Sequence, residues 1–160
     1  MYILLLTGLL LGCEEKTQDS ALPEEAIEPQ LCPNAVYPVL LQVWSDNDSD
    51  NKADTTPFCE APFEVELIDG GGLHSEGDCE FQGGQQTRVL AYVFDGLVNE
   101  EGAYNGEVTL TKRNGDEQQD SFSGNCNEDS GTATISLEWT MTVSTPNGEN
   151  HHRGSMATEE

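Results

Sequence analysis

The residues best suited to chemistry lie in one acidic run, in which carboxylates recur at alternate positions between residues 45 and 55. Ca²⁺ binds about six to eight hard oxygen ligands, and a curling loop directs every second side chain toward one ion. Calcium loops also use a backbone carbonyl from an intervening position. The candidate calcium ligands are Asp46, Asp48, Asp50, Lys52 (through its carbonyl) and Asp54.

The spacing of these acids resembles the acidic calcium loops of EF-hand-like and thrombospondin-type repeats. The run departs from an EF-hand at the twelfth position, where Pro57 replaces the bidentate Glu, and no helix is predicted on either side. It is present as a single copy, whereas thrombospondin-type loops occur in arrays. We favour a solvated loop between strands, and the alternative is a calcium site with an affinity of roughly 10⁻⁴ to 10⁻³ M.

Histidine offers the other candidate for catalysis or metal binding. His74 lies in a glycine-rich stretch, Gly70 to Gly77, near Glu76 and Asp78. A single histidine in a loop is more often simply exposed, and we favour that interpretation here. We also expect the adjacent pair at 151 and 152 to point apart rather than to share a metal ion.

Motifs for nucleophilic, zinc-dependent, phosphate-binding and dinucleotide-binding chemistry are absent from the sequence, which contains no GxSxG, HExxH, P-loop or GxGxxG. We therefore predict a protein that is not an enzyme and that acts in binding or in a structural role. The alternative is a small envelope hydrolase that uses His74 or a carboxylate, or an inhibitor of an envelope enzyme.

Five aromatic residues are candidates for a sugar- or peptide-binding face. A small β domain needs its large side chains inside, so core packing is the favoured role for most of them. Trp44 borders the acidic run and is the aromatic residue most expected at the surface. The five residues are Tyr37, Trp44, Tyr92, Phe94 and Trp139.

The N-terminus resembles the signal sequence of bacterial lipoproteins. Residues 1–12 are uncharged and mostly apolar, which is the length of a signal-peptide core and too short for a transmembrane helix. Leu10-Leu11-Gly12-Cys13 resembles a lipobox, in which the Cys is acylated and the signal is cut before it. The resemblance implies a lipid anchor at Cys13 and a location in the bacterial cell envelope, which we expect to be the outer membrane, on its periplasmic face or at the cell surface.

Four cysteines remain after Cys13, and an exported protein meets oxidising conditions in which an even number predicts disulfides. No CxxC pair is present to indicate a metal site. Four cysteines allow three pairings, which the sequence leaves open. We favour Cys32 with Cys59 and Cys79 with Cys126.

Charge excludes one class of partner. The chain of 160 residues has 30 acidic and 6 basic residues, a net charge of −24. Nucleic-acid binding depends on basic side chains that displace counterions, so we expect no nucleic-acid partner. A large net charge also favours a soluble monomer. The expected partners are a membrane, reached through the lipid anchor, and an unidentified protein or glycan.

Alternation of apolar and polar residues predicts a β domain. Residues 132–143 alternate six times, with Trp139 on the apolar face and Glu138 on the polar one, which indicates a half-buried strand. Shorter strands are predicted at 36–44, 63–67, 88–94 and 107–112. Asn114-Gly115 predicts a two-residue hairpin turn that pairs Arg113 with Asp116.

These elements predict an all-β fold. The favoured form is a small antiparallel sandwich of immunoglobulin-like size, and the alternative is a small β-barrel or meander. The expected organisation is a signal peptide (1–12), a flexible, acidic, lipid-anchored linker (13–30), a disulfide-stabilised β domain (31–144) and a disordered tail (145–160). No family is recognised for the globular part.

Overall fold

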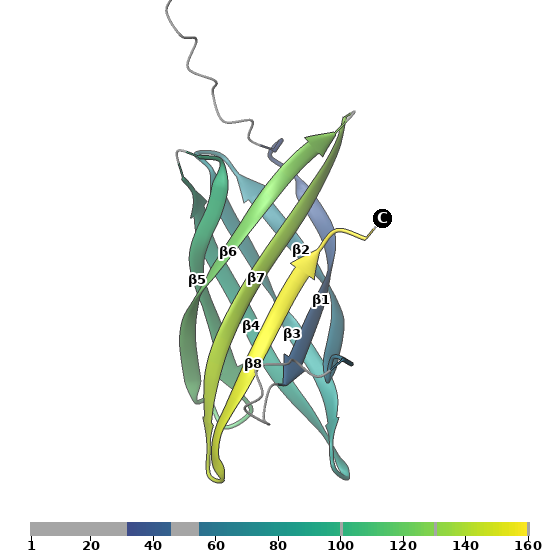
Figure 1. Cartoon of the computed structure of the whole chain (residues 1–160), viewed down its shortest axis with the longest axis vertical. Helices are drawn as coiled ribbons and strands as arrows, with labels where there is room; N and C mark the ends of the chain where they lie inside the picture. The colour runs from purple at the N-terminus through teal and green to yellow at the C-terminus, as the bar shows by residue number, and fades with distance from the viewer. Residues whose placement is uncertain (1–31, 46–54, 100, 130, 160) are drawn as a thin grey trace, which may run out of the picture.

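The computed structural model describes residues 32–45, 55–99, 101–129 and 131–159. These residues form eight β-strands and no helix, as the all-β prediction requires (Figure 1). The strands are β1 (Val36–Ser45), β2 (Cys59–Ile68), β3 (Gly72–Gly83), β4 (Gln86–Val98), β5 (Ala103–Lys112), β6 (Glu117–Asp129), β7 (Thr132–Thr145) and β8 (Gly148–Ala157).

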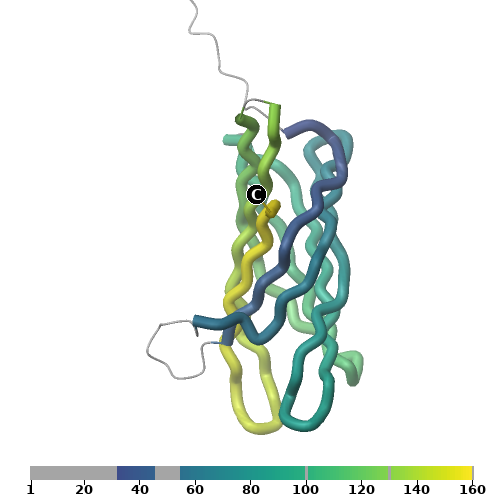
Figure 2. Tube along the Cα trace, turned by 90° about the vertical axis from the view of Figure 1, so that its right-hand side faces the viewer, coloured from purple at the N-terminus to yellow at the C-terminus, as the bar shows by residue number. Residues whose placement is uncertain are grey.

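The eight strands form one closed barrel in which every neighbouring pair is antiparallel. Each strand pairs with the next in the sequence, and β8 then pairs with β1 to close the sheet. Figure 2 shows this closure, with β1 and β8 running side by side. The predicted sandwich is not found, because all eight strands belong to the same sheet, and the barrel alternative fits the structure.

The predicted disordered tail is wrong. Residues 148–157 form β8, which pairs with β7 on one side and with β1 on the other. The β domain therefore extends beyond residue 144. Part of the predicted glycine-rich loop is also a strand, since β3 begins at Gly72 directly after a turn in which Gly70 and Gly71 have positive φ.

The apolar face of each strand points into the barrel. The predicted alternation in β7 is confirmed, because Ile135, Leu137 and Trp139 are buried while Glu138 is exposed. A barrel of about eight strands has an interior just wide enough for side chains to fill. The largest side chains that are fully buried there include Tyr92, Tyr104, Phe94, Leu41 and Leu110.

Aromatic rings fill the space beside inward-facing glycines. A Cβ added at Gly154 would lie 2.0 Å from the Trp139 ring, and one at Gly77 would lie 2.8 Å from the Phe63 ring. Gly106 is more restricted, since an added Cβ would lie 2.1 Å from the backbone oxygen of Asp95. These glycines therefore provide the room in which large side chains from neighbouring strands complete the core.

The β5–β6 hairpin differs from its predicted register by one residue. The two-residue turn would pair Arg113 with Asp116 and Lys112 with Glu117, but Glu117 instead lies opposite Thr111. The cause is a longer turn, because Gly115 has a φ of 85° and its amide donates to the Lys112 carbonyl. This pattern is a type I turn followed by a bulge at the left-handed residue.

The longer turn resolves a conflict in the sequence. The predicted register places Phe122 opposite Glu107, which would mix an acid with the apolar face. The observed register places Phe122 opposite Gly106, and the Phe122 side chain is buried. The bulge at the turn thus keeps Phe122 on the apolar face of the hairpin.

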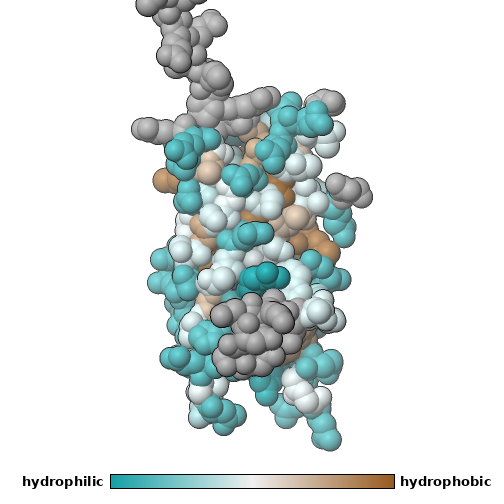
Figure 3. Space-filling model, viewed as in Figure 1, coloured by the Kyte–Doolittle hydropathy of each residue, from teal (hydrophilic) through white to brown (hydrophobic). Residues whose placement is uncertain are grey.

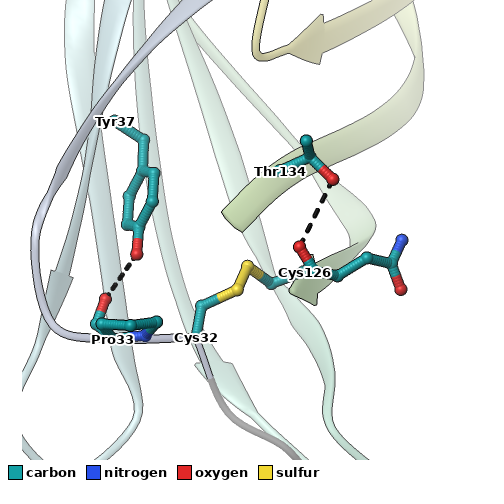
Figure 4. The surroundings of a disulfide bond; sticks show 6 residues. Cys32, Pro33, Tyr37, Cys126 and Thr134 are labelled. Atoms are coloured by element: carbon teal, nitrogen blue, oxygen red, sulfur yellow. Dashed lines mark hydrogen bonds between the residues drawn. A yellow bond between two sulfur atoms is a disulfide. The ribbon is translucent and has the colours of Figure 1, made fainter. Parts of the chain in front are cut away.

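Two disulfides stabilise the barrel, and their pairing corrects the favoured one. Cys32 bonds to Cys126, and Cys59 bonds to Cys79, with a Cα–Cα separation of 6.0 Å in each pair. Figure 4 shows the first bond, which ties the segment before β1 to β6. Beside it, the Tyr37 hydroxyl donates to the Pro33 carbonyl at 2.7 Å.

The second disulfide joins neighbouring strands where their hydrogen-bonded ladder has ended. Only three residue pairs connect β2 to β3, from Ile68 with Gly72 to Glu66 with His74. Cys59 and Cys79 both lie beyond that ladder and both are buried. The bond therefore holds the two strands together along their separated part.

Candidate functional site

The strongest candidate site is a hollow on the outer face of the barrel, with a volume of about 550 Å³. It crosses β1, β8, β7, β6 and β5, and we call it the outer groove. Small outward-facing side chains leave this space, namely Ser121, Ser123 and Ser155. Larger ones border it, namely Trp44, Glu138 and Arg153. Figure 3 shows that face, where residues of intermediate and hydrophilic character predominate.

Strand register brings these side chains together from distant parts of the chain. Trp44 on β1 lies opposite Arg153 on β8, and Arg153 lies opposite Thr140 on β7. In the adjacent row, Glu138 lies between Ser155 and Ser123. The groove therefore depends on the pairing of β8 with both of its neighbours.

Arg153 is held against an aromatic ring. The carbon of its guanidinium group lies 5.2 Å from the centre of the Trp44 ring, which is the geometry of a cation–π contact. Among the described residues, the ion pairs involve His74 alone, so no carboxylate there neutralises Arg153. The Trp44 ring thus orients the guanidinium in the groove, and no carboxylate of the described residues lies within ion-pair distance of it.

The floor of the outer groove is formed by glycine backbone and by buried rings. Gly106 and Gly154 contribute the backbone, and Phe122 and Trp139 lie beneath them. Among the described residues, the buried indole nitrogen of Trp139 has no hydrogen-bond partner. The floor is therefore glycine backbone above two buried rings, while the walls carry hydroxyl, carboxylate and guanidinium groups.

His74 lies on the outer face of β3, away from the outer groove. Its Nδ1 is 2.7 Å from a carboxylate oxygen of Asp95 on β4, and its Nε2 is 4.0 Å from Glu76. The structure thus brings His74 to Glu76, as the sequence indicated, but its close partner is Asp95 rather than Asp78. No group of three metal-binding side chains is found in the described ranges.

The side chain of His152 lies on the inward-facing side of β8 and is partly buried, while the neighbouring His151 is exposed. The two side chains point apart, as predicted. The His152 ring packs against Phe58 with ring centres 5.0 Å apart, and Phe58 packs in turn against Phe81. Burial, assisted by the nearby charges of His151 and Lys112, lowers the pKa of His152 to about 4.

The predicted aromatic residues divide as expected. Tyr92, Phe94 and Trp139 are buried and contact one another in the core. Tyr37 is partly buried against the same core. Trp44 borders the outer groove, and Trp139 contributes to its floor from the core side.

Several predicted site residues lie outside the described residues. They are the lipidation site Cys13 and the candidate calcium ligands Asp46, Asp48, Asp50, Lys52 and Asp54. Lipidation and calcium binding therefore stay predictions.

Sequence analysis missed Arg153 and Glu138. Arg153 belongs to the segment that we expected to be disordered, so no strand placed it beside Trp44. Glu138 was assigned to the outer face of its strand, but the chain has 30 acidic residues and nothing in the sequence marked this one as a site residue. One signal was available, because Arg153 is a rare basic residue in a strongly acidic chain.

No protein-family model, no curated protein and no solved structure matches this chain. None of the segments described forms an apolar helix of membrane-spanning length. Functional inference therefore starts from the geometry of the outer groove.

Proposed function

We propose that this chain is a lipid-anchored lipoprotein of the bacterial cell envelope whose barrel binds a glycan or a protein without catalysing a reaction. The outer groove carries this proposal, because it presents an oriented guanidinium without a carboxylate partner among the described residues. A hollow on which a few polar side chains converge is typical of binding sites.

The closed barrel favours recognition by side chains. Peptides often bind by adding a strand to the exposed edge of a sheet. Here β1 pairs with β8, so the sheet has no free edge along these strands. A partner that approaches β1, β8 and β7 would therefore contact the outward-facing side chains of these strands, among which Trp44, Glu138 and Arg153 surround a hollow.

The anchor is supported by the lipobox-like sequence that ends at Cys13 and by the acidic linker 13–30 that follows it. Acyl chains on Cys13 would hold the barrel at the outer membrane, on its periplasmic face or at the cell surface. The net charge of −24 supports a monomeric barrel at that location.

Replacement of the anchor residue should release the protein from the membrane. We expect a Cys13→Ser variant, expressed in a bacterial host, to move from the membrane fraction to the soluble fraction and to lose labelling by a radioactive or alkynyl fatty acid. An Arg88→Ala variant is the control, because it keeps Cys13 and changes only an exposed side chain of the barrel, and it should stay with the membrane. Persistence of lipid-labelled Cys13→Ser at the membrane would refute the anchor.

The groove itself is tested by an array of envelope glycans and peptides. The purified barrel should bind a subset of the array, and Trp44→Ala should abolish that binding. Arg88→Ala is a matched surface control, since Arg88 is exposed on β4 outside the outer groove. Array binding that survives Trp44→Ala would show that the groove is not the binding site.

The second candidate function is hydrolysis, favoured by the His74–Asp95 pair at 2.7 Å. A carboxylate that orients a histidine is one part of a general-base arrangement. The neighbouring Ser75 is buried, however, and points to the opposite face of β3 from His74. If the unmodified protein hydrolyses a component of the array and His74→Ala does not, this alternative replaces the binding proposal.

A further inference from the structure

We infer that the ligand of the outer groove is an acidic glycan, a chain of sugars in which some units carry a carboxylate. This inference rests on the proposed binding function and adds the chemical class of the ligand.

The carboxylate is indicated by Arg153. Among the described residues it is the only basic one that lines the outer groove, and the Trp44 ring contacts its guanidinium. A planar guanidinium forms paired, charge-assisted hydrogen bonds with a carboxylate. A ligand that supplies this anion would neutralise the positive charge that the described carboxylates leave unpaired.

The sugar is indicated by the other walls of the groove. Ser121, Ser123, Ser155 and Thr140 present hydroxyl groups, each of which can donate and accept a hydrogen bond. Glu138 accepts hydrogen bonds but donates none when ionised. Sugar hydroxyls match this mixture, because each of them also donates and accepts.

The negative charge of Glu138 and of the whole chain limits how anionic the ligand is. A densely charged polyanion would meet Glu138 in the groove and a net charge of −24 around it. A glycan with separated carboxylates places one anion at Arg153 and neutral hydroxyls elsewhere. This distribution favours a carboxylate over a phosphate or sulfate chain.

The length of the groove indicates an extended ligand. It crosses five strands from β1 to β5. Neighbouring strands lie about 4.8 Å apart, so four spacings give about 19 Å. A short oligosaccharide fits this length better than a single sugar.

The test is calorimetric titration of the barrel with tetragalacturonic acid and with its methyl ester, which lacks the negative charge. Loss of a hydrogen bond to a charged group corresponds to about 10- to 100-fold in affinity. We expect the acid to bind and the ester to bind at least about tenfold more weakly. A sulfated tetrasaccharide of the same length should also bind more weakly than the acid.

Two variants locate the effect. Arg153→Gln should reduce the affinity for the acid about 10- to 100-fold and leave that for the ester unchanged. Arg88→Gln, which removes one positive charge outside the groove, should leave both affinities unchanged. Thermal melting of each variant confirms that the barrel remains folded, since both side chains are exposed.

Three outcomes would overturn the inference: equal binding of acid and ester, tighter binding of the sulfated chain, or equal effects of Arg153→Gln and Arg88→Gln. No binding of any oligosaccharide would also overturn it. The array experiment decides the proposed function separately, because array binding that depends on Trp44 would support a binding protein with a different ligand.

Discussion

Removal of the Cys32–Cys126 disulfide should lower the free energy of unfolding by roughly 5 kcal/mol, and removal of Cys59–Cys79 by roughly 3 kcal/mol. A disulfide restricts the unfolded chain, and the restriction grows with the length of the loop that it closes. The first bond joins residues 94 positions apart, and the second joins residues 20 apart. The bond that closes the longer loop, Cys32–Cys126, is therefore the more stabilising one.

Urea denaturation of the two double variants, Cys32→Ala/Cys126→Ala and Cys59→Ala/Cys79→Ala, measures this difference. Small domains are stable by only about 5–15 kcal/mol, so the first variant should unfold at ambient temperature if the parent lies at the low end. Non-reducing peptide mapping of the unmodified protein gives a second measurement. Linkage of Cys32 to Cys59, or a larger loss from the shorter loop, would contradict the structure.

The barrel should lose stability in mild acid because of His152. In the unfolded chain this imidazole takes up a proton near pH 6.5, whereas burial lowers its pKa to about 4 in the barrel. Below pH 6.5 the unfolded state therefore binds more protons, and the free energy of unfolding falls as the pH falls. The loss is fully developed below about pH 4 and amounts to roughly 3 kcal/mol.

Unfolding curves at pH 7 and at pH 4.5 test this effect in two matched variants. His152→Gln should show a smaller loss of stability between these pH values than the unmodified protein. His151→Gln should retain most of the loss, because burial is the main cause of the lowered His152 pKa and the charge of His151 is a smaller one. The carboxylates are the same in all three proteins, so their contribution to the pH dependence cancels in the comparison. If the free energy of unfolding of His152→Gln and of the unmodified protein changed equally between the two pH values, the proposed effect of His152 burial would be wrong.

The strands with regular apolar alternation were predictable. In β2, Phe63, Val65 and Leu67 are buried and the intervening Glu64 and Glu66 are exposed, as the sequence pattern indicates. The same pattern identified β7 and its inward face. In these strands each inward residue is itself large and apolar, so the local sequence contains the signal.

The two missed strands lack that signal because their neighbours fill the core for them. The inward positions of β8 include Asn150, His152 and Gly154, and Trp139 on β7 fills the space beside Gly154. In β3, the Phe63 ring covers Gly77 in the same way. A strand whose inward residues are small or polar becomes recognisable only when its neighbours are known.

Closure of the sheet also determines the candidate site and the disulfides. Trp44 and Arg153 are more than a hundred positions apart and meet only because β1 pairs with β8. Cys32 reaches Cys126 because the segment before β1 lies near the end of β6 in the closed barrel (Figure 4). Sequence spacing carries no information on such long-range contacts, so it could not choose among three pairings.

The central claim is that this barrel binds its partner in the outer groove. Amide chemical shifts of the isotope-labelled protein, followed during titration with tetragalacturonic acid, test it most directly. The account predicts shift changes confined to the strands that line the groove, centred on Arg153, Ser155 and Glu138. Shift changes centred on His74 and Asp95 would contradict it, whereas an unchanged spectrum at saturating oligosaccharide would contradict the acidic-glycan ligand.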